Sequence, residues 1–189
     1  SKLRQRIEGL IEVYNQELER WDRAGNRSED VREFVIDDDE KIKWSAGLRK
    51  SLERGNPIDF EESHFRTGLF RPFTKKDLYF DRSLIERPGL FPKFFPTQES
   101  QEENRILLVP GKGNRKGFGA LAADSIPGYD FAFEKVQALP FYVYDEDGSN
   151  RRENITDWAQ EQFQSHYGDA SITKWDLFHY VYAVLHHPR

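Results

Sequence analysis

The polypeptide contains 189 residues, of which 37% are hydrophobic, 14% aromatic and 32% charged, and its net charge is −5. A chain of this length and aromatic content buries enough apolar surface to fold, which excludes a disordered segment and favours one domain with a small appendage. Cysteine is absent, which excludes disulfides and thiolate metal sites, and the chain has neither a long apolar run nor a basic–apolar start. We expect a cytoplasmic protein with no membrane partner, and the lack of methionine predicts a piece of a longer protein.

The N-terminal part is predicted to begin with a long helix. Apolar residues recur at helical spacing from Leu3 to Trp21 and indicate about six turns that end at Gly25-Asn26. The chain then becomes strongly acidic, since residues 17–40 hold ten acidic side chains against four arginines, a local charge of −6. This acidic part is a poor partner for a polyanion.

A second helical pattern follows the acidic segment. It ends at Gly55-Asn56-Pro57, and Asp37-Asp38-Asp39 lies just before it. Because carboxylates accept hydrogen bonds from the open amides of a helix start, we expect these aspartates to cap the second helix. Its apolar positions are Ile42, Trp44, Leu48 and Leu52.

The middle of the chain is basic and aromatic. Residues 64–93 hold seven Lys or Arg side chains against three acids, a local charge of +4, with phenylalanine and tyrosine interleaved among them. Four prolines between residues 71 and 96 prevent long helices, so we expect short strands and structured loops there.

Strands are predicted next. Ile106-Leu107-Leu108-Val109 is typical of a buried strand, and further strands are expected at residues 118–123 and 141–144. The loop at residues 111–119 contains Lys112, Arg115 and Lys116 and no acidic residue.

The C-terminal part is predicted to form two helices. Either Asn154 or Thr156 caps the first, which ends at Gly168, and Thr173 with Asp176 forms a capping box for the second. The whole pattern predicts an α+β fold, with a small mixed or antiparallel sheet and irregular loops flanked by N-terminal and C-terminal helices. Alternating strands and helices are absent, which argues against a doubly wound parallel sheet.

Two glycine-rich motifs lie in the basic loop and after it. Residues 117–122 match the letters of a dinucleotide fingerprint, but a polar loop precedes them and Pro127-Gly128 follows soon after, so a glycine-containing strand or loop is favoured. Residues 111–117 lack the Gly-Lys-Ser/Thr ending of a P-loop. Two interpretations of this loop stay open: contact with nucleic-acid phosphates, or a solvated hairpin loop.

No catalytic group is predicted within these residues. His179, His186 and His187 lie in the last helix without partners at metal-ligand spacing, so no metal site is expected. The chain has no serine elbow, no cysteine nucleophile and no Pro-Pro dipeptide of the kind found in adenine methyltransferase loops.

Residues 70–82, Phe-Arg-Pro-Phe-Thr-Lys-Lys-Asp-Leu-Tyr-Phe-Asp-Arg, support two interpretations. The phenylalanines are expected to pack into a core around a proline-fixed turn. Lys75, Lys76 and Arg82 are expected to reach phosphates, because cations beside flat side chains are typical of nucleic-acid surfaces.

Three blocks of the sequence resemble a known family. Residues 70–81 are similar to its Tyr-Arg-Pro-Phe-Asp block, residues 139–144 to its Phe-Pro-Leu-Tyr-x-Tyr block, and residues 180–188 to its closing Tyr-Ile-Tyr-Ala-Val-Leu-His-Ser-Pro helix, with His187 in place of serine. They occur in the order found in the C-terminal specificity region of type ISP-like restriction-modification enzymes. Those single-chain, helicase-like proteins join nuclease, ATPase, adenine methyltransferase and target-recognition parts. The resemblance covers roughly residues 41–189.

This resemblance implies a target-recognition domain that holds double-stranded DNA beside a methyltransferase. Residues 57–189 are expected to form this recognition domain, and the negatively charged residues 1–56 are expected to form a helical coupling segment that faces the parent protein. Methylation of adenine N6 and restriction are expected from upstream domains of the same chain, which would use S-adenosylmethionine and ATP with Mg²⁺. No cofactor is expected in these 189 residues.

The candidate DNA-binding residues follow from the basic block, the acid-free loop and a basic pair near residue 150. Asn114 and Asn150 are expected at base edges, because an amide can bridge adenine N6 and N7. The expected phosphate contacts are Arg71, Lys75, Lys76, Arg82, Lys112, Arg115, Lys116, Arg151 and Arg152. The alternative is a non-catalytic docking domain of a helicase-like protein, in which these cations pair with acids.

Overall fold

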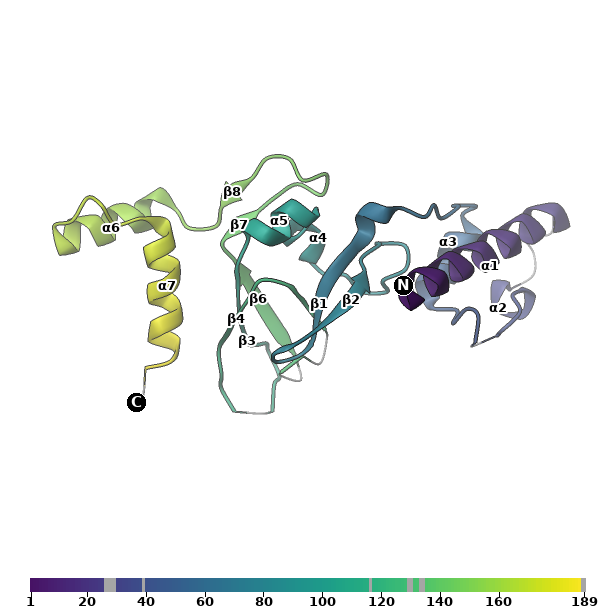
Figure 1. The fold of residues 1–189 in the computed structure, drawn as a ribbon, viewed down its shortest axis with the longest axis horizontal. Coiled ribbons are helices and arrows are strands. Elements are labelled where there is room, and N and C mark those ends of the chain that lie inside the picture. Colours follow the sequence, from purple (N-terminus) through teal and green to yellow (C-terminus); the bar gives the residue numbers. More distant parts are fainter. Residues whose placement is uncertain (26–29, 39, 116, 129–130, 133–134, 188–189) are drawn as a thin grey trace. The chain divides into compact units, whose positions relative to one another are not determined.

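A computed structural model describes residues 1–25, 30–38, 40–115, 117–128, 131–132 and 135–187 (Figure 1). The chain divides into two units. The first contains Ser1–Arg66 and Asp77–Pro88, and the second contains Thr67–Lys76 and Gly89–Arg189. Within the described residues, no helix is both long and apolar enough to cross a membrane.

Helix α1 (Lys2–Ala24) confirms the prediction of a long N-terminal helix. The Ser1 side chain accepts a hydrogen bond from the Arg4 amide at its start, and Gly25 ends it in a left-handed conformation with φ 60°. One stripe of the helix faces the core of the first unit through Ile11, Tyr14, Leu18 and Trp21. The periodic apolar spacing therefore decides which face of α1 is buried.

The second helix is shorter than the apolar pattern from Ile42 to Leu52 predicts. Helix α3 (Ala46–Glu53) begins after Ser45, whose hydroxyl accepts a hydrogen bond from the Leu48 amide at 3.1 Å. The prediction that Asp37-Asp38-Asp39 caps this helix is therefore wrong for the two described aspartates, and Asp39 lies outside the described residues. An aspartate does cap the short helix α2 (Val31–Phe34), where the Asp30 carboxylate accepts from the Arg32 amide at 2.9 Å.

Ile42 and Trp44 lie outside α3 because the chain forms a bridge there, between Asp38 and Ile42. The Trp44 indole donates a hydrogen bond to the Ile36 carbonyl at 3.1 Å, so the ring is held in the core without a helix. The core of the first unit also includes Val31, Val35, Leu48, Leu52 and Ile58. A single 3₁₀ turn (Glu62–His64) follows.

The predicted buried strand is the centre of a three-stranded antiparallel sheet. Strand β3 (Ile106–Pro110) lies between β4 (Leu121–Ala123) and β6 (Val136–Pro140), with Leu107 opposite both Ala122 and Leu139. The strand predicted at residues 118–123 is thus limited to its last three residues, since Gly117 and Gly119 have no side chain to pack on a pleated surface.

The strand predicted at residues 141–144 is also shorter. Strand β7 (Tyr142–Val143) pairs with β8 (Arg152–Glu153) in a two-stranded sheet. Phe141 lies between β6 and β7, where it is fully buried. Asn104 explains the break, because its side-chain oxygen accepts from the Tyr142 amide and its nitrogen donates to the Tyr142 carbonyl, both at 2.9 Å, in the place of a neighbouring strand.

A hairpin precedes this sheet in the chain. Strands β1 (Phe65–Arg71) and β2 (Thr74–Tyr79) are neighbours joined by two residues, and β5 (Ile126–Pro127) pairs parallel to β1. The short helices α4 (Phe91–Phe94) and α5 (Gln98–Glu103) follow the hairpin. The small mixed and antiparallel sheets flanked by helices confirm the predicted α+β fold class.

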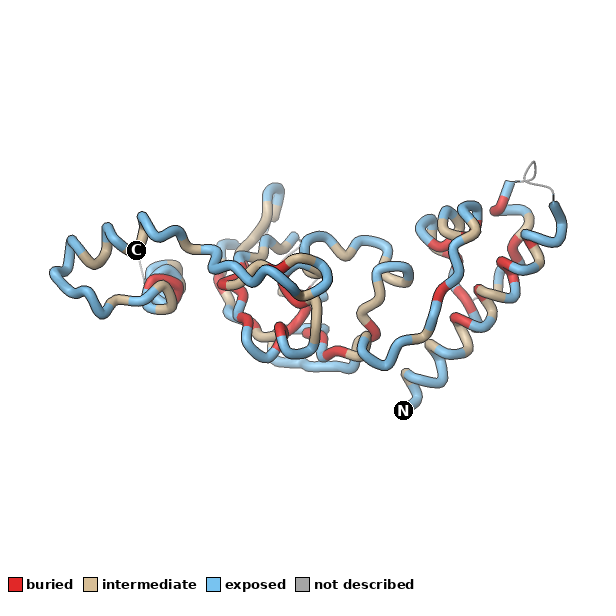
Figure 2. Tube along the Cα trace, turned by 90° about the horizontal axis from the view of Figure 1, so that it is seen from above, coloured by how far each residue is buried: buried red, intermediate tan, exposed pale blue. Residues whose placement is uncertain are grey.

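Two helices end the second unit, as predicted. Helix α6 (Asp157–Tyr167) has Thr156 as its N-cap and Gly168 as its C-cap, and α7 (Lys174–Leu185) begins with the predicted capping box of Thr173 and Asp176. Hydrogen bonds from Thr173 lower the pKa of the Asp176 carboxyl. Of these two helices only α7 contributes buried residues, Leu177 and Phe178. Most of the trace of both helices is pale blue in Figure 2, the colour of exposed residues.

Candidate nucleic-acid interface

The tip of the β1–β2 hairpin gathers cations around an exposed ring. The Arg71 guanidinium lies 4.8 Å from the centre of the Phe70 ring, and the Lys76 ammonium lies 4.2 Å from it. Phe70 is half exposed and Phe73 is 94% exposed, so the prediction that the phenylalanines of this block pack inward is wrong for both. Cation–π contacts hold these two charges beside the exposed ring.

Lys75 lies near an acid. Its ammonium lies 2.9 Å from the Asp124 carboxylate, and both side chains are about half exposed. Burial raises the pKa of Asp124, but the hydrogen bond and charge of Lys75 and a hydrogen bond from Ser125 outweigh it and leave the pKa lowered. An exposed pair of this kind contributes about 0–1 kcal/mol, so Lys75 can exchange Asp124 for another anion at small cost.

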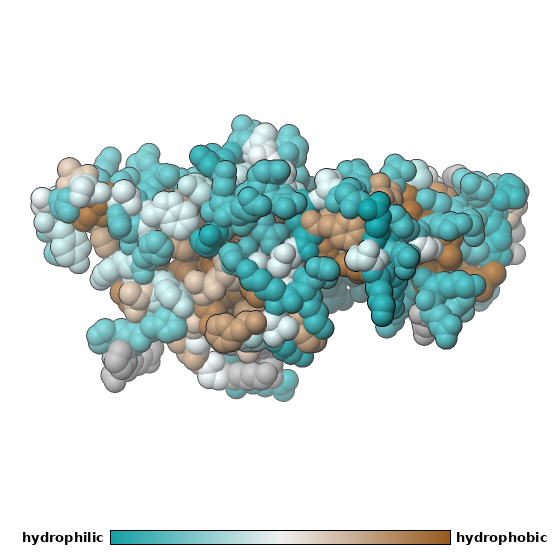
Figure 3. Space-filling view, viewed as in Figure 1, coloured by the Kyte–Doolittle hydropathy of each residue, from teal (hydrophilic) through white to brown (hydrophobic). Residues whose placement is uncertain are grey.

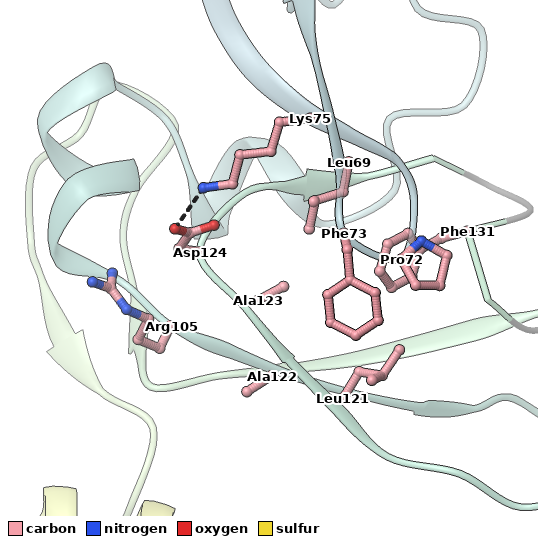
Figure 4. A pocket seen from close by; sticks show the side chains of 10 residues that line it. All are labelled: Leu69, Pro72, Phe73, Lys75, Arg105, Leu121, Ala122, Ala123, Asp124 and Phe131. Carbon is pink, nitrogen blue, oxygen red and sulfur yellow. Dashed lines mark hydrogen bonds and ion pairs between the residues drawn. The ribbon is translucent and has the colours of Figure 1, made fainter.

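A pocket of about 650 Å³ separates the hairpin tip from β4 (Figure 4). Its walls are mainly apolar, with the Lys75–Asp124 pair on one side and Phe73 near Leu121 on the other. This volume is in the range of small-ligand sites. The lining residues are Leu69, Pro72, Phe73, Lys75, Arg105, Leu121, Ala122, Ala123, Asp124 and Phe131.

The turn of the hairpin is Pro72-Phe73. Phe73 has a positive φ of 66° and is 94% exposed. Proline followed by a residue of positive φ is the pattern of a type II turn, in which glycine or asparagine is usual at the second position. A bulky side chain in the left-handed region costs roughly 1–2 kcal/mol, which burial of this ring does not offset.

The basic loop leads from β3 to β4. Lys112 and Arg115 are exposed. The backbone amide of Asn114 donates to the Gly111 carbonyl at 3.1 Å across a turn in which Gly113 has a φ of 81°. No described residue forms an ion pair with Lys112. Lys116 lies outside the described residues.

Figure 1 shows this loop and the hairpin turn at the same end of the second unit. Figure 3 shows brown, apolar atoms gathered at that end beside teal, hydrophilic ones. Exposed rings there include Phe70, Phe73 and Phe118, the last of which is 68% exposed. An end that carries both exposed cations and flat apolar groups has the two components of a nucleic-acid surface.

The sequence motifs for a dinucleotide and for a metal ion can be compared with the described residues of this region. The glycines at residues 117 and 119 lead into strand β4, whereas a dinucleotide fingerprint has them open a helix. Within the described residues, no group of three or more His, Cys, Asp or Glu side chains is placed to hold a metal ion.

A sequence model of the Type ISP C-terminal specificity domain matches residues 1–189. The chain belongs to this family. No curated protein gives a match to the sequence.

Solved structures support this assignment of the specificity domain. The specificity domain is 34% identical to a chain of the DrdV–DNA complex, with a TM-score of 0.78 over 96% of this chain and 17% of that chain. A nuclease-deletion mutant of the Type ISP restriction-modification enzyme LlaGI, in complex with a DNA substrate mimic, is 27% identical, with a TM-score of 0.72 over 86% of this chain and 13% of that chain.

The ATP-dependent Type ISP restriction-modification enzyme LlaBIII, bound to DNA, shares the fold of the specificity domain at 24% identity. The TM-score is 0.73 over 97% of this chain and 11% of that chain. The specificity domain thus spans less than a fifth of each of these chains.

The candidates near residue 150 lie elsewhere in the specificity domain. Figure 1 shows β8 far from the hairpin turn, within the same unit. The Arg151 guanidinium pairs with Glu103 at 2.7 Å, and this hydrogen bond raises its pKa. Arg152 lies 3.4 Å from the Asp145 carboxylate. The structure does not bring these two arginines together with the cations of the hairpin.

Asn150 has a local role in this turn. It adopts a left-handed conformation with φ 51°, which asparagine tolerates, and its amide donates to Asp145 at 2.6 Å. Arg82 belongs to the first unit, where it is exposed. The hairpin and the β3–β4 loop therefore hold the candidates that the structure does bring together.

Two residues beside the loop or the pocket were missed by the sequence analysis. Lys135 lies beside the basic loop, because Pro110 pairs with Val136 and the Gly111 amide donates to the Lys135 carbonyl at 2.8 Å. Its ammonium reaches Gly113, where an added Cβ would be 3.2 Å away. Arg105 lines the pocket. No local sequence signal identifies Lys135, because its place beside the loop depends on the pairing of β6 with β3.

Proposed function

We propose that the specificity domain recognises double-stranded DNA in a larger restriction-modification enzyme, through the hairpin turn and the β3–β4 loop of its second unit. The observation that carries this proposal is the arrangement of cations at one end of that unit. Arg71 and Lys76 lie against an exposed ring, Lys75 pairs with the partly exposed Asp124, and Lys112 and Arg115 extend from the loop. Phosphate contacts of this kind position a protein on duplex DNA.

The comparisons support the same ligand. The solved relatives DrdV, LlaGI and LlaBIII are bound to DNA or to a DNA substrate mimic. In our proposal Arg82, Lys116, Arg151 and Arg152 remain candidate phosphate contacts, and Asn114 and Asn150 candidate base contacts. The pairing of Arg151 and Arg152 with acids makes them weaker candidates than the cations of the hairpin.

We assign no reaction to this chain itself. The parent protein is proposed to methylate adenine N6 with S-adenosylmethionine in an upstream domain, and to use ATP and Mg²⁺ for its helicase-like part in the cytoplasm. Residues 1–56 are proposed to couple the recognition domain, residues 57–189, to those upstream parts. Their acidic composition favours contact with protein over contact with DNA.

A docking function is the second candidate, and the C-terminal helices favour it. Helices α6 and α7 expose large apolar side chains, which in a soluble protein mark a contact surface when they gather in one patch. These residues are Trp158, Tyr167, Tyr180, Val181 and Val184. Docking of this surface and DNA binding by the hairpin are compatible within one protein.

The test is the salt dependence of duplex binding by the full-length protein. Replacing Lys112, Arg115 and Lys116 together by alanine is expected to weaken binding to all sequences and to reduce the slope of log K against log salt by up to about three. Electrophoretic shifts of duplex DNA across a series of salt concentrations measure both.

A matched triple variant is the control. Lys2, Arg6 and Arg54 are exposed cations of the first unit, and their replacement by alanine removes the same charge from outside the proposed surface. Affinity and slope that stay unchanged in the loop variant, or fall equally in the control, would remove the loop from the interface.

A further inference from the structure

The Phe73 side chain is placed where the fold does not need it. Its φ of 66° strains a residue that has a Cβ, and 94% of its surface is exposed, so neither backbone geometry nor burial favours phenylalanine at this turn. A residue that the fold disfavours on both counts is a candidate for contact with a ligand.

The surroundings of Phe73 indicate the chemistry of that ligand. Pro72 fixes the backbone directly before it, which limits the freedom of the turn. Cations lie on both strands that leave the turn, at Arg71 on β1 and at Lys75 and Lys76 on β2. An apolar ring at the tip of a rigid turn, with cations on both sides, fits a base stack between two phosphate backbones.

The ring has no hydrogen-bonding group, so it cannot distinguish bases by their edges. It can contribute to selectivity through the energy needed to unstack a base step, which is lowest at flexible pyrimidine–purine steps. The pocket beside the ring leaves apolar space at Leu121 and Ala123 next to the Lys75–Asp124 pair.

We propose that Phe73 is a wedge that inserts into the base stack of the bound duplex and selects deformable steps. This inference rests on the proposed function, because it requires that the hairpin turn faces DNA. It adds a residue that acts by deformation of DNA to the cations that hold phosphates.

The experiment uses the full-length protein and duplexes that it selects from a randomised library. 2-Aminopurine is placed at successive positions of the selected duplex, since its fluorescence rises when it is unstacked. The wild-type protein is expected to raise the fluorescence several-fold at one step, and Phe73→Ala is expected to abolish this rise and to weaken binding roughly tenfold, as for loss of one base–aromatic contact. The salt slope is expected to stay unchanged, because no charge is removed.

Three further variants separate wedging from folding. Phe73→Trp keeps a flat ring and is expected to keep both signals. Phe73→Gly relieves the left-handed turn, so its melting temperature is expected to equal or exceed that of the wild type while its affinity falls as in Phe73→Ala. Ile36→Ala removes a side chain that is 61% exposed in the acidic segment and is expected to change neither signal.

The outcomes distinguish this inference from the proposed function. A wild-type protein that selects no duplex contradicts both. Duplex binding with no rise in fluorescence at any position, or with equal affinity in Phe73→Ala, contradicts the wedge alone. Binding to vesicles of anionic lipid that depends on Phe73, with duplex affinity unchanged in Phe73→Ala, would assign the turn to a membrane surface and also overturn the wedge.

Discussion

Lys75 pairs with Asp124, and in our proposal it exchanges this partner for a phosphate of DNA. In the free domain the pair satisfies both charges at a distance of 2.9 Å, at the edge of the pocket. In a complex with DNA the ammonium would turn to a phosphate, and the weak exposed pair would be replaced by a stronger contact. In our proposal the pair therefore keeps Lys75 in place without holding it tightly.

The pH dependence of stability tests the pair. The pKa of Asp124 is below its ordinary value of 3.8 in the folded protein, so its ionised form contributes stability above pH 3.8 that is lost as the pH falls through the folded pKa. The free energy of unfolding of the wild type should therefore approach that of Asp124→Asn below pH 3.8. Urea denaturation at a series of pH values measures the difference, which we expect to be below about 1 kcal/mol because both groups are half exposed.

Lys75→Ala provides the control for this measurement. In a Lys75→Ala background, Asp124→Asn should have a smaller effect on the free energy of unfolding above pH 3.8 than in the wild type, since the partner charge is missing. An equal effect in both backgrounds would show that the two side chains do not interact.

At the scale of elements, one buried ring joins the last helix to the central sheet. Phe141 is fully buried and stacks on Trp175 of α7 with ring centres 3.7 Å apart, while Phe178 meets it edge-on at 5.5 Å. Leu107 of β3 belongs to the same cluster. Since α6 contributes no fully buried residue, the two C-terminal helices are held mainly by this aromatic contact and the residues around it.

Truncation of that ring should destabilise the domain strongly. We expect Phe141→Ala to lower the free energy of unfolding by about 3–5 kcal/mol, because it removes a large buried ring and leaves a cavity beside Trp175. Urea denaturation followed by tryptophan fluorescence measures it. Phe118→Ala, at a ring that is 68% exposed, is the matched control and should change stability by less than about 0.5 kcal/mol. Similar losses in the two variants would contradict the packing described for Phe141.

At the scale of the whole molecule, the negative charge is unevenly shared. The first unit holds 19 acidic against 15 basic side chains, and the second 14 against 13. The second unit, which carries the proposed DNA surface, is thus close to neutral overall. Most of the repulsion toward a polyanion comes from the first unit and is a long-range effect that salt screens.

Neutralising part of the acidic segment should therefore matter only at low salt. We expect replacement of Asp37, Asp38 and Glu40 by their amides to raise the duplex affinity of the full-length protein a few-fold at about 10 mM salt, where the screening length is about 30 Å, and to have no effect near 1 M. Electrophoretic shifts at both concentrations measure this. An increase that persists at high salt would instead indicate direct contact between these residues and DNA.

The sequence by itself determined the features whose signals are local. Helix α1 followed from apolar residues at helical spacing, β3 from an uninterrupted apolar run, and α6 and α7 from their caps at Thr156 and Thr173. Three short blocks in order were enough for the family, which the match over residues 1–189 confirms. Each of these signals arises between residues close in the chain, where spacing and side-chain type fix the geometry.

Only the tertiary structure decided which of the candidate residues meet. Lys135 lies beside the β3–β4 loop because β6 pairs with β3, whereas Arg151 and Arg152 pair with Glu103 and Asp145 elsewhere. The hairpin, which belongs to another sheet, has its turn at the same end as this loop (Figure 1). The side chain of Asn104 separates β6 from β7 through hydrogen bonds to Tyr142, which lies 38 positions further along the chain. Such contacts depend on pairing between distant segments. The charge and size of a side chain do not determine which distant residue it contacts.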